Sequence, residues 1–120
     1  MKVFSVTVEV GHTGGGDATG VSLVVDTGST HTMLPESLLA QMHIQPSFQR
    51  YFGFADGNEQ LLGVGFCRII WEGDVADCPV IFGPEGKYLM GATTLEIFDV
   101  SVEPGQHRLV PRIHHERPYF

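Results

Sequence analysis

Apolar and polar residues alternate along the first 25 positions, as they do in paired β-strands. Valines occupy every second position from Val6 to Val10, and this period of two is typical of a strand with one buried face. A glycine-rich loop spans residues 11–17, and a second, largely apolar segment runs over residues 19–25. The pattern therefore predicts a β-hairpin with a long tip.

Three further hairpins follow, each built on a turn that contains glycine. The long strand shared by the first two carries Gly63 and Gly65, which predict a bend or bulge where that strand leaves the first hairpin. The strand pairs and their turns are residues 48–54 and 60–64 around Asp56-Gly57-Asn58, residues 64–71 and 75–82 around Glu72-Gly73, and residues 99–103 and 107–110 around Pro104-Gly105-Gln106.

Two short helices are expected between the hairpins. Residues 33–35 are predicted to end a turn, and residues 35–42 to form a helix with proline in its first turn and an apolar face. The apolar strand 88–91 precedes a second helix over residues 92–98, for which Thr93 or Thr94 is the predicted N-cap.

Composition supports an all-β fold in one domain. The chain has 120 residues, of which 42% are hydrophobic and 18% charged, and its 15 glycines and 7 prolines favour many turns between short strands. A single domain over residues 1–120 is expected, with residues 111–120 as an irregular tail. Whether the chain is a fragment of a longer protein is left open.

Charge and hydropathy exclude several partners. A net charge of −7 argues against a nucleic-acid-binding surface, which would be basic. No apolar run approaches the ~18 residues needed to span a bilayer. The N-terminus alternates like a strand and has no apolar block of a signal peptide, so a cytoplasmic location is expected.

The two cysteines occupy matching positions on either side of one predicted turn. With a two-residue loop at Glu72-Gly73, Cys67 and Cys78 face each other across the strand pair. A cross-strand disulfide is conceivable there. Two reduced thiols packed as small hydrophobic groups are favoured in a cytoplasmic protein.

The residues most indicative of chemistry are Val24–Thr30, which read VVDTGST. Asp26 emerges at the end of a buried apolar strand, where ionisation is costly unless donors surround the carboxylate. Thr27 and Ser29 supply hydroxyls, and Gly28 lets the backbone turn and another group approach. The structural alternative is an aspartate that caps the helix beginning near Pro35.

Other motifs are weak. The glycine-rich loop at residues 11–17 has neither the lysine nor the helix of a phosphate-binding loop. Ser29 and His31 are too close along one turn to act as a nucleophile and base, and a third member is absent. His114, His115 and Glu116 could bind a metal, but a solvated terminus is the expected state, so no metal site is predicted.

The VVDTGST segment and the HTMLP that follows it resemble the active-site loop of retropepsin-like aspartic proteases. Residues 89–91 and the helix after them are similar to the strand that crosses beneath the catalytic strand in that family, and residues 54–60 to its flap. The resemblance implies an all-β, closed acid-protease barrel with one or two short helices. It also implies an aspartic endopeptidase that uses a water nucleophile and no metal or organic cofactor.

Hydrolysis by carboxylates needs one charged group to activate water and one protonated group to polarise the carbonyl. Only Asp26 follows an apolar strand into a glycine turn, because Asp56 and Asp74 lie in hairpin turns and Asp99 follows a helix. The second aspartate must therefore come from another copy, which predicts a symmetric homodimer. By resemblance, Thr27 bonds across the two-fold axis, and the carbonyl of Gly28 accepts substrate hydrogen bonds.

A hydrogen bond donated by the Ser29 hydroxyl would favour the charged form of the Asp26 carboxylate. This predicts an acidic pH optimum for hydrolysis, which moves toward neutral pH in Ser29→Ala. The expected substrates are extended, mainly apolar peptide segments. A catalytically silent dimerisation or peptide-binding module is the alternative, and a monomeric ligand-binding β-barrel is a third reading. The predicted pocket lining is Leu23, Ser29, the flap residues Phe54, Ala55, Asp56 and Gly57, and Ile81 or Phe82.

Overall fold

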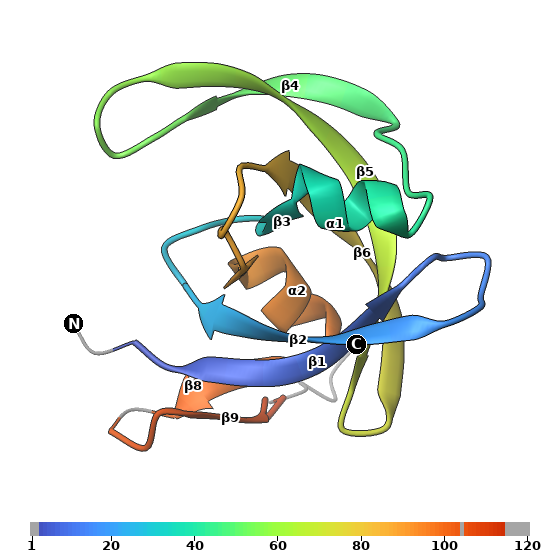
Figure 1. The fold of residues 1–120 in the computed structure, drawn as a ribbon. Helices are drawn as coiled ribbons and strands as arrows, with labels where there is room; N and C mark the ends of the chain where they lie inside the picture. Colours follow the sequence, from blue (N-terminus) through green and yellow to red (C-terminus); the bar gives the residue numbers. More distant parts are fainter. Residues whose placement is uncertain (1–2, 104, 115–120) are drawn as a thin grey trace, which may run out of the picture.

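A computed structural model describes residues 3–103 and 105–114 of the chain. Its strands and helices follow one another in an order dominated by β-structure (Figure 1). The elements are β1 (Ser5–Gly11), β2 (Ala18–Val25), β3 (Thr32–Pro35), α1 (Glu36–Gln41), β4 (Phe48–Gly53), β5 (Glu59–Trp71), β6 (Asp74–Gly83), β7 (Leu89–Met90), α2 (Ala92–Ile97), β8 (Val100–Glu103) and β9 (Arg108–Pro111).

Seven of the strands form one sheet in the order β1-β2-β7-β3-β6-β5-β4. An additional pairing of β1 with β5, between Val10 and Ile69 among others, joins the sheet into a ring. Strands β8 and β9 form a separate two-stranded sheet that lies below β1 in Figure 1. The closed, all-β barrel with two short helices confirms the predicted fold class.

Strand β5 belongs to both the barrel and a projecting hairpin. Its first half, from Glu59 to Val64, pairs with β4, and its second half, from Val64 to Trp71, pairs with β6. In Figure 1 the β4–β5 hairpin arches away from the barrel and over the loop between β2 and β3. A cleft lies between the hairpin and this loop.

Gly63 and Gly65 lie where β5 changes partner, and the pairing register runs through them without a bulge. A Cβ atom at Gly63 would lie 2.8 Å from Pro46 Cβ, and one at Gly65 would lie 2.9 Å from the Gln45 carbonyl oxygen. The glycines are therefore required because the segment before β4 passes directly over β5.

The residues that precede α1 differ from the prediction. Met33, Leu34 and Pro35 were expected to close a turn and begin a helix, but they lie in β3, which runs parallel to β6. All four residues of β3 are buried, so contacts with neighbouring strands outweigh the local turn signal. The helix itself starts at Glu36, with Pro35 at its N-cap.

The second helix is also capped differently from the prediction. Gly91 occupies the N-cap of α2, and no side chain caps the helix. Thr94 is instead buried and bonds to the hydroxyl of Thr32. Its hydroxyl therefore connects α2 to β3 rather than satisfying the start of its own helix.

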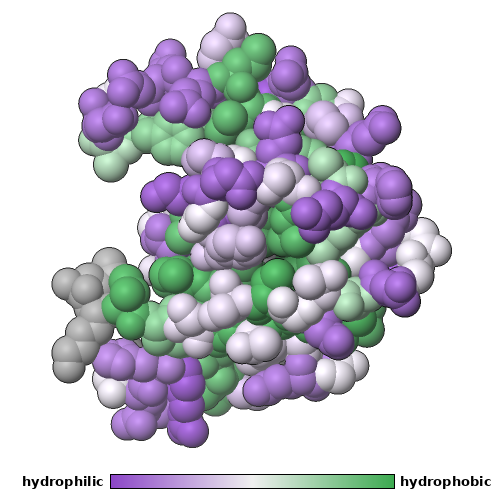
Figure 2. All heavy atoms as spheres, viewed as in Figure 1, coloured by the Kyte–Doolittle hydropathy of each residue, from purple (hydrophilic) through white to green (hydrophobic). Residues whose placement is uncertain are grey.

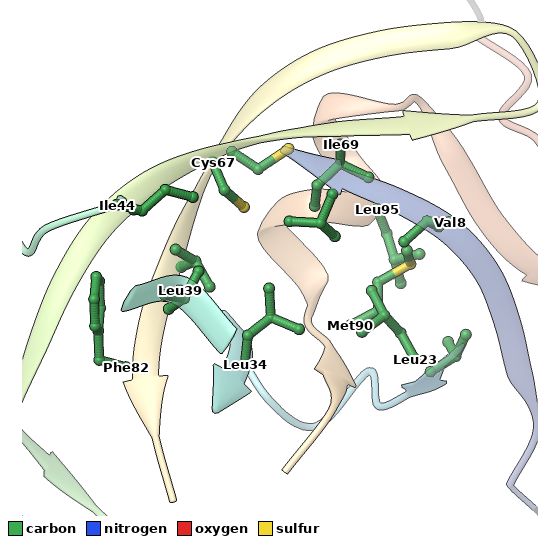
Figure 3. Packing of buried hydrophobic residues seen from close by; sticks show 14 of the residues in the cluster. Val8, Leu23, Leu34, Leu39, Ile44, Cys67, Ile69, Phe82, Met90 and Leu95 are labelled. Carbon is green, nitrogen blue, oxygen red and sulfur yellow. The ribbon is translucent and has the colours of Figure 1, made fainter. Parts of the chain in front are cut away.

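The core lies inside the barrel and beneath both helices (Figure 3). Leu23, Leu34 and Leu39 are fully buried, and Met90 of β7 lies beside Leu23. Burying a leucine side chain contributes about 1.5–3 kcal/mol. The same packing that stabilises the barrel therefore holds β2, β3 and β7, the three strands next to the functional site.

Cys67 and Cys78 face each other in the pairing of β5 with β6, as the two-residue turn predicted. Both are free and fully buried. Burial raises the pKa of the Cys67 thiol to about 12, with Cys78 and Asp77 adding to the effect. Burial also raises the pKa of Cys78, to about 11, against an opposing hydrogen bond from Thr94.

Candidate active site

Asp26 follows directly after β2 and its backbone is held by the neighbouring strand. The Asp26 N–H donates to the Met90 carbonyl at 2.9 Å, and the Val25 N–H donates to the Phe4 carbonyl at 2.9 Å. The Ser29 N–H donates to the Asp26 carbonyl at 3.2 Å and closes a tight turn. These bonds fix where the carboxylate leaves the sheet.

Both carboxylate oxygens of Asp26 accept a hydrogen bond from within its own turn. Oδ1 accepts from the Gly28 N–H at 3.0 Å, and Oδ2 accepts from the Ser29 hydroxyl at 3.0 Å. The side chain is half-buried. The two hydrogen bonds restrict rotation of the side chain, so the turn fixes the orientation of the Asp26 carboxylate.

The turn rests on the corner between β7 and α2. The Ala92 N–H donates to the Ser29 carbonyl at 2.7 Å, and the Thr93 N–H donates to the Thr30 carbonyl at 2.8 Å. A Cβ atom at Gly91 would lie 2.4 Å from the carbonyl carbon of His31. Only glycine allows this approach, because the atoms that would clash belong to the backbone.

A cleft with a volume of ≈ 400 Å³ lies between this loop and the β4–β5 hairpin. Figure 2 shows it as a hollow that opens on the left of the molecule, under the projecting hairpin. It is mostly apolar, with hydroxyl groups and two basic side chains. Its lining residues are Gly28, Ser29, Thr30, His31, Met33, Phe52, Gly53, Phe54, Ile81, Lys87 and Leu89.

Some of the predicted site residues meet at this cleft. Gly28 and Ser29 line its floor, and Phe54 and Ile81 also line it. Asp26 and Thr27 are not in its lining. They border an adjoining depression that includes Phe4 at the N-terminus of β1. The aspartate therefore lies at the junction of the cleft and a second exposed surface.

Two predicted lining residues lie elsewhere. Leu23 is fully buried, beside Met90 and Val8 in the core (Figure 3), because its side chain points to the barrel interior. Phe82 packs near Leu39 and borders a different depression, next to α1. Successive side chains of a strand point to opposite faces, so Ile81 reaches the cleft and Phe82 does not.

The predicted flap tip is an exposed turn outside the lining of the cleft. Its Asp56 carboxylate accepts hydrogen bonds from the backbone and the side chain of Asn58, each at 2.9 Å. Gly57 has a φ of 87°, a conformation that favours glycine. Ala55, Asp56 and Gly57 thus shape the hairpin turn, and Phe54 before them is the residue that lines the cleft.

Sequence reasoning missed several residues of the cleft. Phe52 and Leu89 were placed on strands, but the sequence did not show which face of each strand meets the cleft. His31 was considered only as a partner for Ser29. Its ring instead packs edge-to-face on the ring of Phe52, with 5.7 Å between the ring centroids. Lys87 lies in a polar turn, and such turns usually indicate only solvent exposure.

Within residues 3–103 and 105–114, no group of three or more histidine, cysteine, aspartate or glutamate side chains could hold a metal ion. In the same ranges, no helix has the length and apolar character to cross a bilayer. His114 binds Asp99 at 2.7 Å. His115, Glu116 and the rest of the predicted tail from 115, like Pro104 of the last turn, lie outside the described residues.

No family model and no curated protein matches the chain. Solved structures do. The EIAV protease complexed with the inhibitor HBY-793 has a TM-score of 0.66 and 14% identity, over 81% of this chain and 88% of that protein. The simian foamy virus (mac) protease has a TM-score of 0.54 and 20% identity, over 77% of this chain and 93% of that protein. Both are retropepsin-like aspartic proteases, and these likenesses show that the chain has the retropepsin-like fold.

Proposed function

We propose that the protein is an aspartic endopeptidase that is active as a homodimer. The observation that carries the proposal is the Asp26 carboxylate, which accepts hydrogen bonds from Gly28 and Ser29 and lies beside a cleft roofed by a hairpin. A carboxylate held in one orientation by serine and backbone donors can act as the general base that activates water. The fold shared with viral proteases is consistent with this chemistry.

The homodimer follows from the need for a second carboxylate. Among the described residues that line the cleft, none is acidic. Asp26 and the exposed Thr27 instead border the adjoining depression. A second copy placed there would bring its own Asp26 to the first, and two such carboxylates share one proton because both cannot ionise at close range.

In the proposed reaction, the charged Asp26 of one copy takes a proton from water, and the oxygen attacks the carbonyl carbon of the peptide bond. The protonated Asp26 of the second copy gives its proton to the carbonyl oxygen. The tetrahedral intermediate then collapses: the C–N bond breaks, the leaving nitrogen takes a proton from one aspartate, and one hydroxyl group of the intermediate returns its proton to the other aspartate, which restores the singly protonated dyad and leaves a carboxylic acid. Thr27 would lock the two copies together, and the Gly28 carbonyl would accept a hydrogen bond from the substrate backbone.

The lining of the cleft supports extended, mainly apolar peptides as substrates. Met33, Phe52, Phe54, Ile81 and Leu89 provide apolar walls. An extended peptide between the loop and the β4–β5 hairpin would add strand-like hydrogen bonds to exposed backbone groups. The hairpin would have to move to admit it, as lids over active sites commonly do.

The experiment is hydrolysis of casein and of blocked apolar peptides by the purified protein at mildly acidic pH, together with sedimentation over a range of concentrations. We expect cleavage, inhibition by a statine-type compound, and complete loss in Asp26→Asn. At low concentration the rate should rise with the square of protein concentration. Peptide binding without cleavage would support a silent peptide-binding module, and a stable active monomer would contradict the shared dyad.

A further inference from the structure

Lys87, which precedes β7, is the only lysine or arginine among the described residues that line the cleft, and no aspartate or glutamate lines it. His31, which follows the Asp26 turn, also lines the cleft. The chain as a whole has 14 acidic residues against 7 lysines and arginines. A cleft that contains a lysine but no carboxylate therefore differs from the composition of the chain.

The backbone around both residues is fixed. The main chain of His31 packs directly against Gly91, and its half-buried ring contacts Phe52 of β4. The Lys87 N–H donates to the Pro84 carbonyl at 3.3 Å, and the next residue, Tyr88, accepts a hydrogen bond from the Val24 N–H at 2.9 Å. Lys87 is therefore anchored through its neighbour to β2, the strand that directly precedes Asp26.

Neither basic residue has an acidic partner in the part of the chain that the structure describes. The ion pairs there join Arg68 to Asp77, Arg108 to Glu103, and His114 to Asp99. A lysine ammonium offers three donors, and an imidazole ring carries at least one N–H donor in any charge state. The wall of the cleft thus presents donors that are available to a ligand.

On the basis of the proposed function, we propose that the cleft selects peptides that carry a carboxylate side chain, glutamate or aspartate, next to the apolar residues it binds. Lys87 is the specificity-determining residue, and its ammonium pairs with the carboxylate. His31 contributes a donor from the floor of the cleft. Because a symmetric dimer presents this wall twice, the preference should occur on both sides of the scissile bond.

The test uses peptides with blocked ends, one apolar core, and glutamate or its neutral isostere glutamine at each flanking position in turn. The quantity measured is the ratio of kcat/KM for the glutamate peptide to that for the glutamine peptide. In the unmodified protein we expect this ratio to be about five at the preferred flanking positions, which is the effect of a partly exposed ion pair. Lys87→Gln should bring the ratio to about one, and Lys87→Glu should favour a lysine-containing peptide instead.

Arg68→Gln is the matched control, since it removes one positive charge from β5 outside the cleft. It should leave the ratio unchanged. A ratio near one in the unmodified protein, or a raised ratio that persists in Lys87→Gln, would overturn the inference. Hydrolysis of the glutamine peptide would still support the proposed function in either case. If no peptide is hydrolysed, the proposed function fails. The charge preference is then tested by the ratio of the binding affinities for the glutamate and glutamine peptides, which should exceed one and return to about one in Lys87→Gln.

Discussion

The hydroxyl oxygens of Thr32 and Thr94 lie 2.5 Å apart, although 62 positions separate the two residues in the sequence. Both side chains are fully buried. Thr32 also accepts a hydrogen bond from the Gly91 N–H at 3.1 Å. This pair joins β3, the N-cap of α2 and the end of β7 behind the Asp26 turn, so it connects the strands on which the candidate active site depends.

Replacement of Thr32 by valine should destabilise the protein more than replacement of Thr94. Thr32→Val removes the partner of the Gly91 backbone N–H and one partner of the Thr94 hydroxyl, whereas Thr94→Val removes one partner of the Thr32 hydroxyl and the weaker bond to the Cys78 thiol and leaves the Gly91 N–H satisfied. A buried polar group without a partner costs about 1–3 kcal/mol. Urea unfolding should show this order, with exposed Thr19→Val changing stability by less than about 0.5 kcal/mol. Equal losses for the two buried threonines would contradict this account.

Replacement of Gly91 by alanine should displace the Asp26 turn. The new Cβ would meet the main chain of His31 at 2.4 Å, which the backbone can relieve only by moving the loop over residues 29–31. We expect a loss of about 1–3 kcal/mol in stability and, for the proposed peptidase, about a 100-fold loss of kcat. Gly20→Ala in β2 is the control, since no atom lies within 4 Å of its Cβ position. Wild-type rates in Gly91→Ala would show that the close contact does not position the turn.

Replacement of Ser29 by alanine should lower the kcat of the proposed peptidase by roughly 10-fold or more, which is the loss expected for one hydrogen bond to a charged group. The Ser29 hydroxyl donates to Asp26 Oδ2 at 3.0 Å, and with the Gly28 N–H on Oδ1 it holds the carboxylate in one orientation. Without the hydroxyl, the carboxylate keeps only the bond to Gly28 and can rotate away from the position in which it activates water. Ser29→Thr keeps a hydroxyl and should retain the original rate. A kcat unchanged by the alanine variant would refute this role.

The buried thiols should make the protein less stable at alkaline pH. Cys67 and Cys78 have folded-state pKa values of about 12 and about 11, above the ordinary value of 9.0. Their contribution is complete below the ordinary value and declines as pH rises, because the unfolded thiols ionise first and the folded ones keep their protons. The free energy of unfolding, measured with urea at about pH 8 and about pH 10, should fall. The fall should be smaller in the Cys67→Ala/Cys78→Ala double variant, which cannot ionise at these positions.

Reactivity provides a second measurement on the same thiols. Since the thiolate is the nucleophile, buried thiols with raised pKa values react slowly with alkylating reagents in the folded protein. We expect modification of Cys67 and Cys78 only at the rate of unfolding. Rapid labelling of either residue under native conditions would contradict its burial.

The sequence predicted the hairpins well because their signals are local. A period of two and a glycine turn were sufficient to place Cys67 opposite Cys78, which the structure confirms. The VVDTGST segment likewise indicated an aspartate at the end of a buried strand, with donors in the following turn. These features depend on residues within a few positions of one another.

Features that depend on distant contacts were not predictable. Strand β3 is four residues long and forms only because β6 and β7 lie on either side of it. Leu23 was expected in the pocket because the sequence does not show which face of a strand lies inside a closed barrel, and Ile81 could not be separated from Phe82 for the same reason. The bond between Thr32 and Thr94 joins residues that carry no common motif.

Strand β5 has a consequence for how such a binding site could change size. Its 13 residues run without interruption from the barrel into the hairpin. Two residues inserted into its barrel half would leave each side chain on the same face of the sheet but would push the β4–β5 hairpin outward by ~7 Å. The length of this strand thus sets the distance between the hairpin and the opposite side of the cleft. Adaptation to bulkier ligands is expected to occur through the turn at residues 54–58, which can lengthen without shifting the rest of the molecule.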